Sequence, residues 1–95
     1  MTFEWDEAKA AANLAKHRVA FDEAKTVFDD PLYVDFYDPE HSADEPRYII
    51  IGTSRQARLL IVSYTERSDA IRLISARELT STEREAYEEN QTRSE

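Results

Sequence analysis

Three runs of apolar residues dominate the middle of the chain, and only a few polar residues separate each run from the next. They fall within residues 47–53, 58–65 and 71–76. Runs of this length are typical of β-strands, and connections this short predict antiparallel hairpins. Because the strand centres are apolar on both faces, we expect the sheet to be covered on at least one side and partly on the other.

The segment before these strands predicts two helices that would supply the cover. Asp6 is a candidate N-cap for a helix that ends near Lys16. A narrow apolar stripe at helical spacing predicts close packing against this helix, and its members are Ala8, Ala11, Ala12 and Ala15. A second helix is predicted to begin at the cap Asp22 and to end before Pro31, because the residue before a proline disfavours the helical region.

Signals at both ends complete the predicted fold. Residues 32–37 predict a fourth strand, and residues 3–5 alternate as in a short edge strand. Residues 80–83 (TSTE) form a capping box that opens a last helix towards Asn90. We therefore predict an α+β fold: two N-terminal helices packed on an antiparallel sheet of about four strands, plus a C-terminal helix.

The length and composition narrow the class of protein. Residues 1–90 are expected to form a single domain, and residues 91–95 a frayed polar tail. With no cysteine the chain offers no disulfide framework and no thiolate zinc site, and the dense acids match no calcium loop, so no metal site is predicted. No signal-peptide pattern opens the chain, and residues 59–62 are far shorter than the ~20 apolar residues of a membrane span. A cytoplasmic location is expected.

Charge is distributed unevenly along the chain. Residues 47–79 carry no lysine and only three acids, and they hold six arginines: Arg47, Arg55, Arg58, Arg67, Arg72 and Arg77. This stretch therefore nets +3, whereas residues 1–46 net −8 and residues 80–95 net −3. Because the planar guanidinium matches phosphate and keeps its charge, the middle third is the expected place for a polyanionic partner.

Short segments along almost the whole chain resemble a known family. The matching pieces are Phe3-Glu4-Trp5-Asp6, Lys9, Asn13, Lys16-His17, Val19, Phe21, Glu23-Ala24, Val27-Phe28-Asp29-Asp30-Pro31, Asp38, His41, Glu45, Arg47, Ile51-Gly52, Arg58-Leu59-Leu60, Thr65-Glu66-Arg67, Arg72-Leu73-Ile74-Ser75-Ala76-Arg77, Glu83-Arg84 and Tyr87. In order and spacing they resemble the BrnT family, the toxin half of a bacterial type II toxin–antitoxin pair. The sequence departs from that pattern at two turns: Arg18 stands where a glycine usually follows the Lys-His pair, and Gln56-Ala57 replace a glycine before Arg58.

The resemblance implies a RelE-like fold and a ribonuclease that arrests translation. It also implies a BrnA-type antitoxin that neutralises the toxin and carries the complex to operator DNA. No cofactor and no membrane partner are expected, and the stoichiometry with the antitoxin is left open, including higher-order complexes. The alternative is a catalytically weak module of the same fold, whose role is to bind the antitoxin and modulate operator binding.

RNA can be cut without a metal when its 2′-hydroxyl attacks the neighbouring phosphate. The reaction needs a base, cations for the phosphorane and an acid for the leaving oxygen. The catalytic candidates are Arg67, Arg77, Glu66 and His17, and the candidate phosphate contacts are Arg72, Lys16 and Arg58. The assignment of base and acid stays open between Glu66 and His17; His41 is expected to shape the acidic loop around it.

Each candidate also has a structural alternative. The arginines would equally shield sheet edges or pair with the many acids, Glu66 would be a surface ion-pair partner, and His17 would cap or pack its helix. Strand alternation puts Arg72 and Arg77 on opposite faces unless a bulge re-aims one of them. The C-terminal helix offers little beyond Ala86 and Tyr87 to a core, so it is expected to contact the antitoxin or a second subunit.

Overall fold

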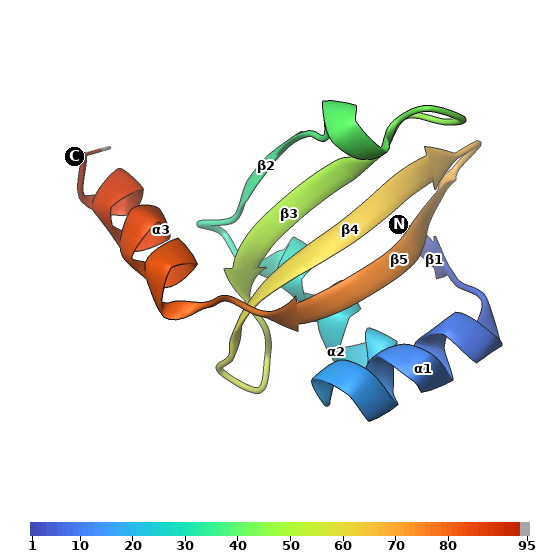
Figure 1. Ribbon diagram of the computed structural model, residues 1–95, viewed down its shortest axis with the longest axis horizontal. Helices are drawn as coiled ribbons and strands as arrows, with labels where there is room; N and C mark the ends of the chain where they lie inside the picture. The colour runs from blue at the N-terminus through green and yellow to red at the C-terminus, as the bar shows by residue number, and fades with distance from the viewer. Residues whose placement is uncertain (94–95) are drawn as a thin grey trace.

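The computed structural model describes residues 1–93, and the last two residues lie outside it. Its sheet has the strand order β1–β5–β4–β3–β2. The strands are β1 (Thr2–Glu4), β2 (Val34–Tyr37), β3 (Tyr48–Thr53), β4 (Leu59–Arg67) and β5 (Ala70–Glu78). The helices are α1 (Glu7–His17), α2 (Phe21–Ala24) and α3 (Ser81–Arg93), with 3-10 turns η1 (Lys25–Asp29) and η2 (Pro39–His41). Helices α1 and α2 lie together beside the sheet, and α3 extends away from the end of β5 (Figure 1).

The sheet has five strands and is mixed, so the prediction of about four antiparallel strands was right for β2–β5 and wrong for the whole. Strand β1 pairs in parallel with β5, and Phe3 lies opposite Ile71. The other neighbouring strands pair antiparallel. A parallel pair needs a long crossover between its strands. Here almost the whole fold lies between them, which explains why local spacing did not predict the pair.

Two of the three predicted helix caps are confirmed. The Asp6 carboxylate accepts hydrogen bonds from the backbone N–H groups of Ala8 (2.8 Å) and Lys9 (3.3 Å). At α3, the N–H of Thr80 donates to the Glu83 carboxylate (2.9 Å) and the N–H of Glu83 donates to the Thr80 hydroxyl (3.2 Å). This reciprocal capping box fixes where α3 begins. The helix then runs to Arg93, into the stretch predicted to be a frayed tail.

The prediction for the second helix was wrong at its start and in its form. Its N-cap is Ala20, which makes no side-chain cap hydrogen bond, and Asp22 lies inside the first turn. After Ala24 the chain tightens into the 3-10 turn η1, which ends at Asp29. The buried Phe21 and Ala24 belong to the main core, so tertiary packing overrides the local cap preference.

The core lies between these helices and one face of the sheet. Its members are Val19, Phe21, Ala24, Val27, Ile50, Leu60, Val62, Tyr64, Ile71, Leu73 and Ala76. Helix α1 is fixed to β5 by the buried Asn13, whose amide donates to the carbonyl oxygens of Val19 (2.9 Å) and Ala76 (2.8 Å) and whose Oδ1 accepts from the Ala76 N–H (3.0 Å). The alanine stripe is exposed, contrary to the prediction, because α1 turns Asn13 and the half-buried Ala10 and His17 inward.

Both turns that depart from the family pattern adopt a left-handed backbone. Arg18 ends α1 with φ 60°, and Ala57 has φ 65° in the turn between β3 and β4. This region suits glycine and costs other residues roughly 1–2 kcal/mol. The glycines of the family pattern therefore match a conformational need that this chain meets with larger residues. Within residues 1–93, no helix is both long and apolar enough to cross a bilayer.

Candidate active site

Strands β3, β4 and β5 pack one face against helices α1 and α2. Their other face, here called the open face, is not covered by these two helices. Along β4, Leu60 and Val62 are buried under the helices, whereas Ile61 and Ser63 are only half-buried on the open face. Strand β3 continues the pattern with half-buried Ile49. The open face therefore has an apolar floor that is partly accessible to solvent.

A bulge in β5 brings two arginines to this open face. Ser63 pairs with Ser75, but the next residue of β4, Tyr64, pairs with Leu73, so Ile74 is an extra residue. A bulge reverses the alternation of side chains beyond it. Arg72 and Arg77 both alternate with buried neighbours on the helix-covered face, and both lie half-buried on the open face. Simple alternation had predicted opposite faces.

The open face is hollowed into a pocket of about 310 Å³, here called the central pocket. Its floor is apolar, and its walls carry a histidine, an aspartate, two arginines and two serines. The lining residues are Asp38, His41, Arg47, Ile49, Ile61, Ser63, Ile74, Ser75 and Arg77. An apolar hollow with a few convergent polar groups is the usual form of a ligand site.

The acidic loop after β2 supplies the pocket with a His–Asp pair. His41 Nδ1 lies 2.8 Å from Asp38 Oδ2, and the other oxygen of Asp38 accepts from the N–H of Glu40 (3.2 Å). The Asp38 side chain is 12% exposed, whereas that of His41 is 64% exposed. A carboxylate at Nδ1 favours the tautomer that carries its proton there, which leaves the Nε2 lone pair to act as a base.

The two arginines of the pocket differ in what they bind. Both nitrogens of the Arg77 fork donate to the Glu83 carboxylate, at 2.8 and 3.0 Å. These hydrogen bonds, with that from Thr80, lower the pKa of Glu83 to about 2. Arg47, at the end of the loop, forms no side-chain ion pair with any carboxylate of the described chain. Of the two pocket arginines, the half-buried Arg47 is therefore the one more available to an added anion.

Comparison with known proteins identifies the family of the chain. The family model described as "Ribonuclease toxin, BrnT, of type II toxin-antitoxin system" matches residues 5–83. The chain belongs to the BrnT family. The crystal structure of the Brucella abortus ribonuclease toxin BrnT superposes with a TM-score of 0.63 at 25% sequence identity, covering 85% of this chain and 99% of that one. A search of curated proteins found no match.

Six of the seven residues predicted to act in catalysis or phosphate binding lie outside the central pocket of this BrnT-family protein. Arg67 pairs with Glu45 (3.3 Å), and Glu66 is exposed at the far end of β4. Arg72 shares the open face with Arg77 but pairs with Glu4 (2.8 Å). The two arginines are five positions apart along β5, or roughly 15 Å at the usual rise, and they bind different carboxylates, so they are not placed to share one phosphate.

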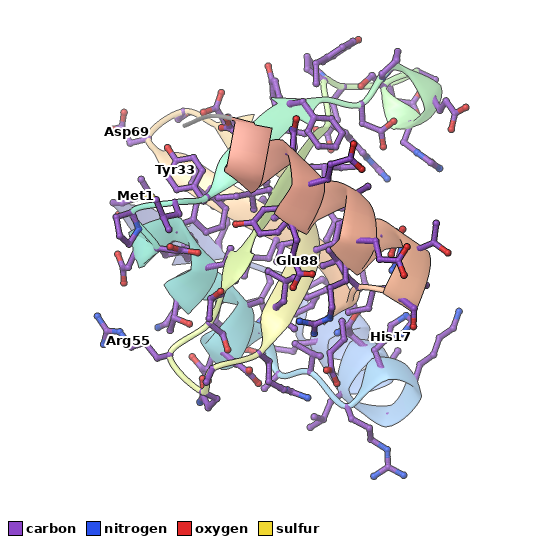
Figure 2. All side chains as sticks on the ribbon, turned by 90° about the vertical axis from the view of Figure 1, so that its left-hand side faces the viewer. Met1, His17, Tyr33, Arg55, Asp69 and Glu88 are labelled. Atoms are coloured by element: carbon purple, nitrogen blue, oxygen red, sulfur yellow. The ribbon has the colours of Figure 1, made fainter. Side chains whose placement is uncertain are left out.

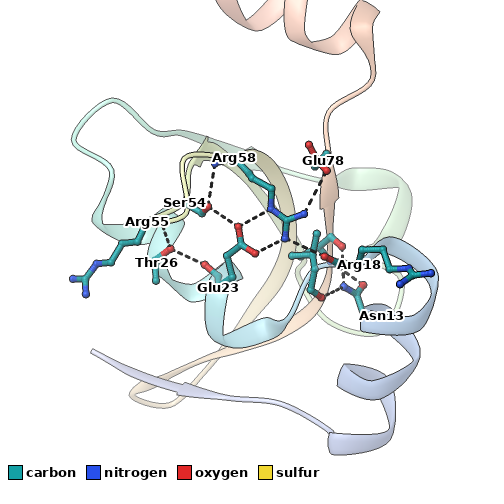
Figure 3. Close-up of polar contacts among 10 residues, drawn as sticks. Asn13, Arg18, Glu23, Thr26, Ser54, Arg55, Arg58 and Glu78 are labelled. Atoms are coloured by element: carbon teal, nitrogen blue, oxygen red, sulfur yellow. Dashed lines mark hydrogen bonds and ion pairs between the residues drawn. The ribbon is translucent and has the colours of Figure 1, made fainter.

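Arg58 has a structural position on the other side of the molecule. Its guanidinium makes two hydrogen bonds to Glu23, whose side chain is 8% exposed, and donates to the carbonyl oxygen of Arg18 (3.0 Å). Ser54 also donates to Glu23 (2.7 Å), as Figure 3 shows. Hydrogen bonds from Arg58 are the largest cause of the lowered pKa of Glu23. The cluster links the end of α1, helix α2 and the β3–β4 turn.

Lys16 and His17 also lie away from the pocket. They form the last turn of α1, where Lys16 is exposed and His17 half-buried. Figure 2 shows His17 on α1 and Arg55 reaching outward from the β3–β4 turn. Of the predicted catalytic residues, the structure brings only Arg77 to the central pocket.

Sequence reasoning missed the other polar residues of the pocket. Asp38, His41 and Arg47 were each part of the family resemblance, but none was a predicted site residue, and His41 was expected only to shape the acidic loop around it. A usable signal was present: His41 follows Asp38 by three residues across Pro39, a spacing that suits a capped turn. The serine hydroxyl of Ser42 closes that turn by donating to the Asp38 carbonyl oxygen and accepting from the Arg47 N–H (2.9 Å).

One group of side chains in this loop has the composition of a metal site. Asp38, Glu40 and His41 each offer a ligand atom, and these atoms lie within 4.8 Å of one another. The Nδ1 atom of His41 is hydrogen-bonded to Asp38. A metal bound at Nδ1 would replace this hydrogen bond.

A second hollow, here called the lateral groove, lies between α3 and the neighbouring strands. It has a volume of about 480 Å³, and its lining includes Val34, Phe36, Ile51, Ile61, Glu83, Ala86 and Tyr87. It shares Ile61 with the central pocket, so the two hollows adjoin on the open face. The predicted partner-binding residues Ala86 and Tyr87 therefore line an apolar groove, with the exposed Phe36 opposite.

Proposed function

We propose that this toxin is an endoribonuclease that cuts RNA by metal-independent attack of the 2′-hydroxyl and so arrests translation in the bacterial cytoplasm. The observation that carries the proposal is the composition of the central pocket. It combines the His41–Asp38 pair with the guanidinium groups of Arg47 and Arg77. These are a proton-transfer group and two cations, the parts that phosphodiester cleavage requires.

In this mechanism the Nε2 atom of neutral His41 takes the proton of the 2′-hydroxyl. The 2′-oxygen then attacks the adjacent phosphorus, and the bond from phosphorus to the 5′-oxygen breaks. Arg47 and Arg77 stabilise the negative charge that builds on the phosphorane. The 5′-oxygen leaves with a proton from the imidazolium or from water, and the products are a 2′,3′-cyclic phosphate and a 5′-hydroxyl. Asp38 orients the imidazole and stabilises its protonated form.

The partner proposed for the lateral groove is a BrnA-type antitoxin, through which the complex would bind operator DNA. Ala86 is exposed on α3 and Tyr87 is half-buried beside it, above an apolar floor. Helix α3 also carries more acids than bases within the described side chains. An amphipathic partner segment with basic flanks would complement this surface, and it would lie next to the central pocket.

One observation favours the second candidate, a catalytically weak module that mainly binds the antitoxin. Arg67, Arg72 and Arg77 are each paired with a carboxylate, and the whole chain has a net charge of −8. A negative surface slows and weakens association with RNA. Of the two arginines that line the pocket, only Arg47 forms no ion pair with a carboxylate of the described residues.

The deciding experiment compares the wild-type protein with His41→Ala on single-stranded RNA in the presence of EDTA. We expect the substitution to lower the cleavage rate about 100- to 10,000-fold, the range for a lost proton-transfer group. Glu40→Gln, in the same exposed turn, is the matched control and should cut at nearly the wild-type rate. The fragments should end in a 2′,3′-cyclic phosphate.

Three results would contradict parts of this proposal. Equal rates for wild type and His41→Ala would remove the histidine from the mechanism. Activity lost in EDTA and restored by a divalent cation would replace the hydrogen-bonded pair by a metal site. An absence of cleavage by the wild-type protein, with and without ribosomes, would favour the binding module.

A further inference from the structure

The contact between Arg77 and Glu83 lies where the two hollows of the open face adjoin. Arg77 lines the central pocket, and Glu83 lines the lateral groove. The Glu83 carboxylate takes both donors of the guanidinium fork, at 2.8 and 3.0 Å. A phosphate binds arginine through the same two parallel donors. Glu83 therefore fills the place that a phosphate would take on Arg77.

The helix that carries Glu83 buries little side-chain surface among its described residues. Among its described side chains, Glu83 and Tyr87 are half-buried and the others are exposed. Tyr87 donates a hydrogen bond to the carbonyl oxygen of Leu32 (3.2 Å). By contrast, α1 is held by the buried Asn13 amide and packs along β5. Few buried contacts oppose a movement of α3, and low local stability is typical of segments that move in regulation.

We propose that Glu83 is a built-in competitor of the substrate phosphate, and that α3 must release Arg77 before the central pocket binds RNA at full strength. The inference rests on the proposed function because it assigns a regulation to the same pocket. The described structure is then the resting form. In the active form the fork of Arg77 has exchanged the carboxylate of Glu83 for a phosphate of the RNA.

With competition of this kind, the apparent affinity for RNA equals the intrinsic affinity multiplied by the fraction of molecules in which Arg77 is available. A bidentate pair whose side chains remain 38% and 36% exposed is partly screened by water, so this fraction is small but not negligible. With roughly a tenth of the molecules open, removing the competitor would tighten binding about tenfold. The closed state also protects Arg77 from other cellular anions.

The test uses Glu83→Gln, which removes the charge but keeps the capping box, because glutamine serves at this helical position as well as glutamate. The matched control is Glu85→Gln, an identical charge change at an exposed residue two places along α3. The probe is a single-stranded 2′-O-methyl RNA, which cannot be cleaved. We expect Glu83→Gln to bind it about tenfold more tightly than wild type, and Glu85→Gln less than twofold. In an Arg77→Ala background, Glu83→Gln should give no gain.

The alternative role for Glu83 is to hold Arg77 in the geometry that the reaction needs. In that case Glu83→Gln would bind and cut more weakly than wild type, and the inference would be wrong. Equal gains for Glu83→Gln and Glu85→Gln would also overturn it, since they would reflect net charge alone. If tighter binding occurs but no variant cuts ribose-containing RNA, competition at Arg77 stands and the catalytic proposal fails.

Discussion

Two arginine–glutamate pairs in this protein are bidentate but differ in their surroundings: Arg58 binds Glu23 through Nε and Nη2, and Arg77 binds Glu83 through Nη1 and Nη2. Arg58 and Glu23 meet on the helix-covered side, where the Glu23 side chain is only 8% exposed. Arg77 and Glu83 meet on the open face, where the Glu83 side chain is 36% exposed. The first pair is surrounded by the fold, and the second lies at the edge of a pocket.

The difference shows in the other hydrogen bonds of each pair. Glu23 also accepts from Ser54, and Arg58 also donates to the backbone of Arg18, so this pair connects segments that are distant along the chain. The remaining side-chain hydrogen bonds of Glu83 stay within its own helix cap at Thr80. The same side-chain chemistry therefore stabilises the fold in one region and controls access to a cation in the other.

The first prediction that follows from this comparison distinguishes a role of the pocket arginine from an effect of the general surface charge. Arg47→Ala should lower RNA cleavage about 100-fold, because it removes a cation from the developing phosphorane charge. Arg55→Ala is the matched control: Arg55 lies outside the central pocket, and its ion pair with Asp29 (3.2 Å) is exposed. Rates on one RNA at low and fixed salt provide the measurement. Similar losses for both variants would show that only net positive charge matters.

The second prediction tests the structural pair. Glu23→Gln should lower the free energy of unfolding by about 2 kcal/mol, because it leaves Arg58 charged and without its buried partner. Asp29→Asn, which removes the exposed partner of Arg55, should change stability by less than about 0.5 kcal/mol. Urea unfolding gives both values. Replacing the pair together, as Glu23→Gln with Arg58→Met, should recover part of the loss, since no buried charge is then left unpaired and the other partner of Arg58, Glu78, is exposed.

If instead Glu23→Gln unfolds like wild type but cuts RNA poorly, the Arg58–Glu23 pair would serve the reaction and not the stability of the fold. Arg58 would then belong to the substrate site, as the sequence analysis had proposed. Measuring both stability and cleavage on the same variants distinguishes these outcomes. The double variant is informative here, because a role in RNA binding would not return with methionine.

Much of the fold was predictable because local rules determine it. The strands β3, β4 and β5 follow from apolar runs and short turns, and the caps at Asp6 and Thr80 follow from side chains that satisfy free N–H groups. Residues 3–5 were predicted as a short edge strand, but their parallel pairing with β5 was not, because Phe3 lies opposite Ile71, far away in the sequence. Pairing between strands that are distant in the sequence cannot be predicted from the local spacing of apolar residues.

The site was harder to predict than the fold, and one extra residue shows why. The bulge at Ile74 decides that Arg72 and Arg77 share a face, and nothing in the local pattern requires it. Likewise, the acidic loop resembles a solvated surface until β2 and β3 bring Asp38 and His41 beside Arg77. Composition located the arginines, but only the three-dimensional structure shows which carboxylate each one faces.

The smallest effect is a pH dependence that should differ between wild type and Glu83→Gln. Hydrogen bonds from Arg77 and then from Thr80 lower the pKa of Glu83 from 4.5 to about 2, so these contacts stabilise the protein above pH 4.5, and this stability is lost as the pH falls towards 2. Both side chains are more than a third exposed, so the discounted contribution is about 1 kcal/mol. Between pH 6 and pH 2.5, the unfolding free energy of wild type should fall by that much more than that of Glu83→Gln.

Acid also protonates Glu23 of the buried pair, whose pKa is lowered as well, so this second loss of stability must be separated from the first. That loss occurs in both proteins and cancels in their difference, so the difference isolates the pair on the open face. The helical signal of α3 should weaken over the same pH range in wild type, while Glu83→Gln should already show the weaker attachment at pH 6. Parallel acid profiles for the two proteins would mean that the Arg77–Glu83 contact carries no free energy in solution, and α3 would then have no closed state to leave.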